Sequence, residues 1–137
     1  MNTRSTVAVA PGRGITFASW TLRILAAVAF LTAGSAKLAA APMMVAVFDQ
    51  IGIGQWFRVV TGVLEVAGAL ALLIRPTAGL AGLMLSVTMA FGVLTHLLLI
   101  GGSPVPALAL LLITAAVAWL ERQRIAHTLR PLRRVWA

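Results

Sequence analysis

The feature that most constrains this chain is one long stretch without charge. Residues 76–120 form 45 consecutive positions that hold no Asp, Glu, Lys or Arg. Because one membrane-spanning helix needs about 20 apolar residues, this stretch is long enough for two. The Gly- and Pro-rich segment 101–106 supplies the turn that divides it. The pattern therefore predicts membrane spans at about 78–100 and 105–120.

Two more apolar runs precede this stretch. They cover about residues 17–40 and 57–74, and Pro76 ends the second because proline cannot continue a helix. Between them, a short apolar segment from Pro42 to Phe48 leads into a Gly-rich polar turn. This segment is too short to cross a bilayer, so we expect it to be interfacial or re-entrant. The fold class predicted is all-α, an integral membrane four-helix bundle.

Composition also indicates that the chain folds in a lipid bilayer. Hydrophobic residues make up 61% of the 137 residues and charged residues 10%, whereas a soluble domain is about half apolar and a quarter charged. So short a chain could not hide that much apolar surface inside a water-soluble globule. The chain has no cysteine, which excludes a disulfide scaffold and cysteine-based chemistry.

The basic residues predict the orientation. Eleven Lys and Arg stand against three Asp and Glu, and most of them flank the apolar runs. Arg4 and Arg13 precede the first run, Arg75 separates the second and third, and five Arg follow the fourth. The positive-inside rule then places both termini in the cytoplasm. We expect a multi-pass cell-membrane protein with a membrane domain at 1–121 and a basic cytoplasmic tail at 122–137.

Those basic residues have the bilayer as their expected partner. The tail predicts an amphipathic strip that lies on anionic lipid and is interrupted at Pro131. The sequence shows neither a basic groove nor an aromatic stacking platform, so we expect no nucleic-acid binding.

Four ionisable side chains fall inside the predicted spans, where each costs at least about 2.5–3.5 kcal/mol near the midplane. They are Lys37, Arg58, Glu65 and His96. The predicted topology brings all four toward one half of the membrane. We expect Lys37 or Arg58 to neutralise Glu65. Another basic residue of the first apolar run, Arg23, is expected to anchor the inner interface.

Helical spacing places these groups on shared faces. Arg58, Thr61 and Glu65 recur at helical intervals, and Thr95 adjoins His96. We therefore predict Glu65 and His96 as catalytic residues, and Lys37, Arg58, Thr61 and Thr95 as ligand-binding residues. We expect no metal site, because a lone His needs further ligands.

Structural alternatives exist for each of these groups. One alternative is that Glu65 and its basic partner form an ion pair that only fixes helix packing. Arg58 can be an end-of-helix anchor whose side chain extends to the interface. His96 can be a hydrogen-bonding link to a neighbouring helix.

The chain resembles the DoxX-like family of small four-helix membrane proteins over roughly residues 20–122. The matching segments are 33–38, 48–52, 58–69, 75–78 and 95–97. One departure is Gly54, where relatives often have proline. The resemblance implies a four-helix bundle and carries the family's Lys, Arg, Glu and His onto Lys37, Arg58, Glu65 and His96. Some relatives are associated with quinone-linked oxidation and membrane redox assemblies.

Two main functions follow as hypotheses. In the first, the chain is a quinone-linked redox membrane subunit that binds a lipophilic ligand, with a quinone as the candidate cofactor. Without cysteines, haem motifs or a nucleotide fingerprint it would be a non-autonomous oxidoreductase subunit with a redox partner protein. In the second, it is a small-molecule transport or binding bundle, as a homo-oligomer. A third hypothesis is a membrane anchor for a soluble partner. The sequence leaves open whether the chain is an enzyme.

Overall fold

The computed structural model describes residues 12–126, and within that range every regular element is helical. The expectation of an all-α fold is confirmed for this part of the chain. The basic tail beyond residue 126, with its expected amphipathic strip, lies outside the described residues, as does Arg4. In chain order the elements are α1 (Arg13–Leu38), α2 (Pro42–Ile51), α3 (Gln55–Leu73), α4 (Ala78–Thr95), the π-helix η1 (His96–Ile100) and α5 (Val105–Leu120).

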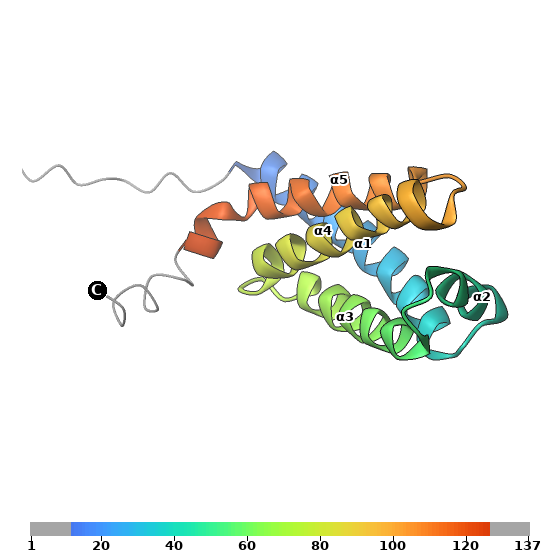
Figure 1. The fold of residues 1–137 in the computed structure, drawn as a ribbon. Helices are drawn as coiled ribbons and strands as arrows, with labels where there is room; N and C mark the ends of the chain where they lie inside the picture. The colour runs from blue at the N-terminus through green and yellow to red at the C-terminus, as the bar shows by residue number, and fades with distance from the viewer. Residues whose placement is uncertain (1–11, 127–137) are drawn as a thin grey trace, which may run out of the picture.

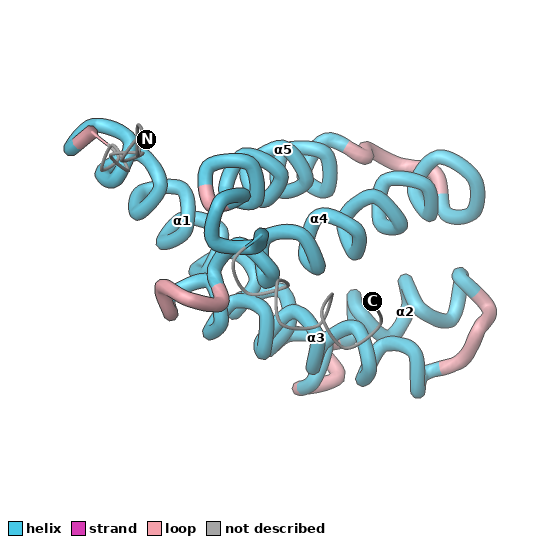
Figure 2. The backbone as a smooth tube through the Cα atoms, turned by 90° about the vertical axis from the view of Figure 1, so that its left-hand side faces the viewer, coloured by secondary structure: helices cyan, strands magenta, loops and turns pink. Residues whose placement is uncertain are grey.

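The helices pack as two pairs (Figures 1 and 2). Helix α1 packs mainly on α3, and α4 mainly on α5. The two pairs meet through α3 against α4 and α1 against α5, and they diverge toward the end where α2 lies. The short helix α2 contacts α3, η1 and the end of α1. This divergence is what leaves space for a site near α2.

The core lies where the two pairs are closest. Its fully buried members include Phe30 of α1, Leu72 of α3, Leu85 of α4 and Val117 of α5. Small residues permit the close approach, as is usual for helices packed in membranes. For example, a Cβ atom on Gly82 would lie 3.0 Å from the backbone oxygen of Thr114 on the neighbouring helix.

Local sequence explains where the helices begin and end. Pro42 is the first residue of α2, the position at which proline costs no helical hydrogen bond. Gly52 ends this helix with φ of 79°, a left-handed conformation that glycine adopts without strain. Helix α3 ends at Leu73, just before Arg75 and Pro76.

Four helical segments occupy the runs from which the sequence predicts membrane spans: α1, α3, α4 with η1, and α5. Three of them, Arg13–Leu38, Gln55–Leu73 and Ala78–Ile100, are long and apolar enough to cross a membrane. Helix α5 is equally apolar but has 16 residues. Much of the helix surface is apolar and exposed, including Phe17, Leu98 and Trp119. These features are those of a membrane protein.

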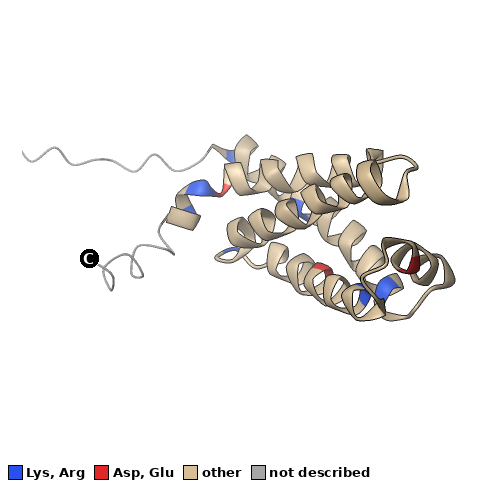
Figure 3. Cartoon of the chain, in the orientation of Figure 1, with Lys and Arg blue, Asp and Glu red and all other residues tan. Residues whose placement is uncertain are grey.

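The charged side chains are confined to a few places (Figure 3). They gather at the α2 end of the bundle and at the opposite end, where α5 stops, while α4 and α5 themselves carry none. The charged residues buried within the helices are Arg23 of α1 and Arg58 and Glu65 of α3.

Candidate ligand-binding site

A cavity of about 680 Å³ lies between the diverging helix pairs, bounded by α2 and η1. Most of its wall is aliphatic or aromatic side chain, with Phe30, Phe48, Phe57 and Phe91 among the contributors. Its polar lining residues are Lys37, Thr61, Glu65, Thr88, Thr95 and His96. Five of the six predicted site residues therefore line one cavity, and its size is that of pockets for small organic ligands.

Lys37 and Glu65 form an ion pair at the wall of this cavity. The Lys37 Nζ atom lies 3.0 Å from one Glu65 carboxylate oxygen and 2.8 Å from the other. The two side chains are 14% and 3% exposed. Of the two partners that the sequence allowed for Glu65, the structure selects Lys37. The pair is neutral overall, and it links the end of α1 to the middle of α3.

Two glycines bring these helices close enough for that pair to form. A Cβ atom on Gly34 would lie 2.8 Å from a methyl carbon of Val66 and 3.0 Å from the backbone oxygen of Gly62. A Cβ atom on Gly62 would lie 3.1 Å from the Cβ of Lys37. Side chains at these positions would separate α1 from α3, and Lys37 would then no longer reach Glu65 in the same geometry.

Arg58 is buried beside this pair but binds other groups. Its guanidinium donates to the backbone carbonyl of Lys37 and, over 2.6 Å, to Oε1 of Gln55. Gln55 in turn donates from Nε2 to the carboxylate of Asp49 and to the backbone oxygen of Val45, at 2.7 and 3.0 Å. Arg58 therefore does not line the cavity or hold Glu65. It fixes the end of α1 and, through Gln55, helix α2.

His96 is the first residue of η1, on the far side of the cavity from α3. Its Nδ1 atom lies 3.0 Å from the backbone oxygen of Gly101. Because a carbonyl oxygen can only accept a hydrogen bond, Nδ1 is the donor in this contact, and Nε2 is the ring nitrogen that can accept a hydrogen bond when it carries no proton. The His96 contact closes the loop after η1, where Gly101 has φ of 66°.

The threonines that line the cavity use their hydroxyl protons locally. Thr61 donates to the backbone oxygen of Arg58 at 3.0 Å, and Thr95 to that of Phe91 at 2.8 Å. Thr88 donates to the backbone oxygen of Met84 at 3.1 Å. Their hydroxyl oxygens keep lone pairs that can accept a hydrogen bond from a ligand.

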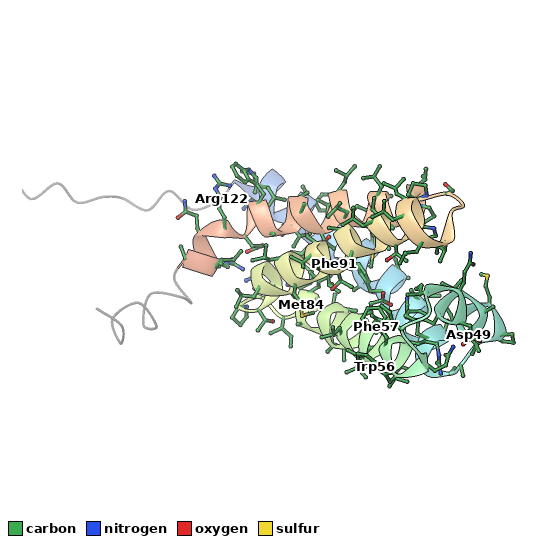
Figure 4. All side chains as sticks on the ribbon, viewed as in Figure 1. Asp49, Trp56, Phe57, Met84, Phe91 and Arg122 are labelled. Carbon is green, nitrogen blue, oxygen red and sulfur yellow. The ribbon has the colours of Figure 1, made fainter. Side chains whose placement is uncertain are left out.

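Sequence reasoning missed the residues that support this site. The sequence placed Gln55 in a polar turn and indicated no role for it. Gln50 joins α2 to η1, on the other side of the cavity, by donating to the backbone oxygen of Ile100 at 3.3 Å. Asp49 and Phe57 lie together with Trp56 at the α2 end (Figure 4), where the Phe48 and Phe57 rings are 5.9 Å apart. A glutamine on each side of a Gly-rich turn was the only signal available.

Arg23, which was expected to anchor the inner interface, is buried at 1% exposure. Its Nε donates to the backbone oxygen of Leu72, and its guanidinium stacks 4.1 Å from the Trp20 ring. Glu121 lies 4.0 Å away and accepts a hydrogen bond from Ser19 at 2.8 Å. Arg23 therefore belongs to a second polar cluster, at the opposite end of the molecule from α2.

Comparison with known proteins supports the resemblance seen in the sequence. The sequence model of the DoxX-like family matches residues 21–121, a segment that contains every residue lining the cavity. No curated protein matches significantly, and neither does any solved structure. Because the family match covers well over half of the chain, the protein belongs to the DoxX-like family.

Proposed function

We propose that this protein is a membrane subunit that binds an uncharged, quinone-like lipophile in the cavity between α2 and η1. The observation that carries the proposal is the cavity's composition: an apolar wall holding one neutral ion pair, Lys37–Glu65, and a hydrogen-bonding histidine. Such a wall favours a lipophilic body, and a few convergent polar groups orient its head. The charges of the pair cancel, so the cavity offers little electrostatic attraction to a ligand that carries a net charge.

The donor set fits a quinone or quinol head. Two of the three Lys37 N–H groups are directed to Glu65, so the third is available to a carbonyl oxygen. Nε2 of His96 can accept from a hydroxyl group. Glu65 is the carboxylate that would exchange a proton with the bound ligand. When bound, the quinone would supply the two-electron chemistry, and we propose that a redox partner protein supplies or takes the electrons.

In the membrane we propose four spans, formed by α1, α3, α4 with η1, and α5, with 1–121 as the membrane domain and 122–137 as a cytoplasmic basic tail. The distribution of Arg supports cytoplasmic termini in a multi-pass cell-membrane protein. Helix α2 is then the interfacial or re-entrant segment. Its single buried residue, Phe48, supports a peripheral position.

The test is the lipophile that remains bound after mild-detergent purification, identified by mass spectrometry. Wild type is expected to retain a stoichiometric quinone, and Glu65→Gln to lose most of it because Lys37 would keep its charge without a counter-ion. Glu121→Gln is the matched control, since it makes the same change at a buried carboxylate outside the cavity. Equal quinone in all three samples, or none in wild type, would overturn the proposal.

Proton-coupled transport of a small molecule, by a homo-oligomer, is a second candidate. The observation that favours it is Glu65 itself, a carboxylate buried on an apolar helix beside a cavity. Transport predicts ligand-dependent proton flux in vesicles, abolished in Glu65→Gln. A subunit that only binds a quinone shows no such flux.

A further inference from the structure

Away from the cavity, a cluster of charged residues closes the opposite end of the bundle, and we define it as the arginine cluster: Arg23, Arg75, Arg124 and Glu121. It joins α1, the turn between α3 and α4, and residues 121–126, which follow α5. Three guanidinium groups and one carboxylate give it a net charge of +2. Glu121 attracts the buried charge of Arg23, while Arg75 and Arg124 repel it.

The single carboxylate is already engaged. One oxygen of Glu121 accepts from Ser19 at 2.8 Å, and the other lies 3.2 Å from the guanidinium of Arg124. Arg23 is 4.0 Å from the carboxylate, and its buried Nη2 has no hydrogen-bond partner among residues 12–126. In the described part of the chain, one buried guanidinium nitrogen of Arg23 is thus left without an acceptor.

Two arginines form the accessible rim of the cluster. Arg75 is exposed, and the Arg124 side chain is 44% exposed. The Arg124 guanidinium also lies 3.5 Å from the backbone oxygen of Arg75, which keeps the two residues adjacent. Gly79 permits this arrangement, because a Cβ there would lie 2.6 Å from a side-chain carbon of Ile125. The packing therefore fixes a pair of neighbouring guanidinium-bearing residues at the surface.

The surroundings indicate an amphiphilic partner. Trp20 stacks on Arg23, and Trp119 stacks 4.5 Å from Arg122, and Trp and Arg together mark the headgroup level of a membrane helix. Figure 4 shows Arg122 at the end of the molecule opposite Asp49. The last turn of α5 also presents an exposed aromatic side chain, Trp119, which is 67% exposed. A lipid that carries a phosphate would meet both the guanidinium groups and that aromatic side chain.

We propose that the arginine cluster is a binding site for the phosphate oxyanion of an anionic phospholipid. Arg75 and Arg124 make the contacts, and Arg23 adds fixed positive charge behind them. Guanidinium groups bind phosphate through paired, charge-assisted hydrogen bonds. This site is independent of the cavity, so it holds whatever ligand the cavity takes.

The test measures retention of phosphatidylglycerol and of phosphatidylcholine by the detergent-solubilised protein, using native mass spectrometry. Wild type is expected to retain phosphatidylglycerol preferentially. Arg75→Gln and Arg124→Gln are each expected to weaken that preference by about fivefold. The control is Arg13→Gln, which removes the same charge from an exposed arginine in the first turn of α1.

A further variant changes the binding in the opposite direction. Glu121→Gln removes the carboxylate that competes for the arginines, so it is expected to strengthen retention of phosphatidylglycerol. A gain in binding cannot come from misfolding. Equal retention of the two lipids, an equal loss in Arg13→Gln, or full displacement of the lipid by excess inorganic phosphate would overturn the lipid site.

Discussion

Arg58 donates a hydrogen bond to the backbone carbonyl of Lys37, so the arginine holds the chain of the lysine while the lysine's ammonium group reaches elsewhere. That group binds Glu65 at the wall of the cavity. The two cations therefore have different tasks: one neutralises the carboxylate, and the other fixes where the neutralising residue lies.

Removing the lysine is expected to be more damaging than removing both members of the pair. Lys37→Met leaves the Glu65 carboxylate buried without a counter-ion, at a cost of about 3–5 kcal/mol in the free energy of unfolding. The double variant Lys37→Met/Glu65→Gln has no buried charge at this point and is expected to recover most of that loss. Thermal unfolding in detergent measures both. A double variant as unstable as the single one would contradict the pairing.

Arg58→Lys is expected to change the positions of Lys37 and α2 without changing the charge of the site. A lysine lacks the planar guanidinium group whose nitrogens reach both the Lys37 carbonyl and Gln55. One or both hydrogen bonds are therefore lost, at a cost of about 1–3 kcal/mol in the free energy of unfolding. The charge is conserved, so a loss of lipophile affinity here would come from displaced Lys37 and α2. Binding titration beside unfolding checks this. Unchanged stability and affinity would mean that the Arg58 contacts are dispensable.

Glycine substitutions test the close approach of α1 and α3. Gly34→Ala places a methyl group within 3.0 Å of neighbouring atoms, one of them a backbone oxygen, and is expected to destabilise by about 1–3 kcal/mol. Gly92→Ala is the control, because its Cβ would lie 3.7 Å from the Cβ of Ala107, an ordinary contact. Alanine also favours a helix there by up to about 1 kcal/mol. Melting temperatures should move in opposite directions, and equal shifts would refute the argument.

Gln50 is expected to control access to the cavity. Its hydrogen bond to Ile100 joins α2 to the end of η1, whereas α2 is held to α3 by Gln55 and by the Phe48–Phe57 contact. Gln50→Ala removes this hydrogen bond, which lowers the free energy that holds α2 against η1 by about 1 kcal/mol. We therefore expect the ligand to exchange about fivefold faster at similar affinity. Because the chain has no cysteine, a single engineered thiol in α2 can report the opening by its labelling rate. An unchanged rate would place the entrance elsewhere.

Two variants of His96 separate its structural and ligand-binding roles. His96→Asn keeps a side-chain N–H donor for the Gly101 carbonyl but has no equivalent of Nε2, whereas His96→Leu has neither. We expect hydrogen exchange in residues 96–102 to rise in the leucine variant only, and ligand affinity to fall in both. Affinity that survives in His96→Asn would show that the histidine serves the loop alone.

The helical segments were predictable because long apolar runs and their proline or glycine boundaries are local signals. The spacing of Arg58 and Glu65 also predicted one buried face of α3, and both residues are buried. The predicted topology also brought Lys37, Glu65 and His96 toward one another, and the structure places all three along one cavity. Helical periodicity and the cost of buried charge sufficed for that.

The partners of the arginines were not predictable in the same way. Arg58 binds a backbone carbonyl on another helix, and carbonyls carry no sequence signal. The burial of Arg23 depends on Ser19 and Glu121, which are 102 residues apart in the chain and meet only once α5 has packed on α1. Contacts that arise from tertiary packing require the structure.

The central claim is that the cavity between α2 and η1 holds the lipophile. The most direct measurement is photocrosslinking of the membrane-reconstituted protein with a quinone that carries an azide, followed by peptide mapping. The account predicts label on cavity residues such as Met44, Phe57 and Met89, reduced by excess unlabelled quinone and in Glu65→Gln. Label spread evenly over exposed lipid-facing positions such as Val28 and Leu112, and unaffected by competitor, would contradict it.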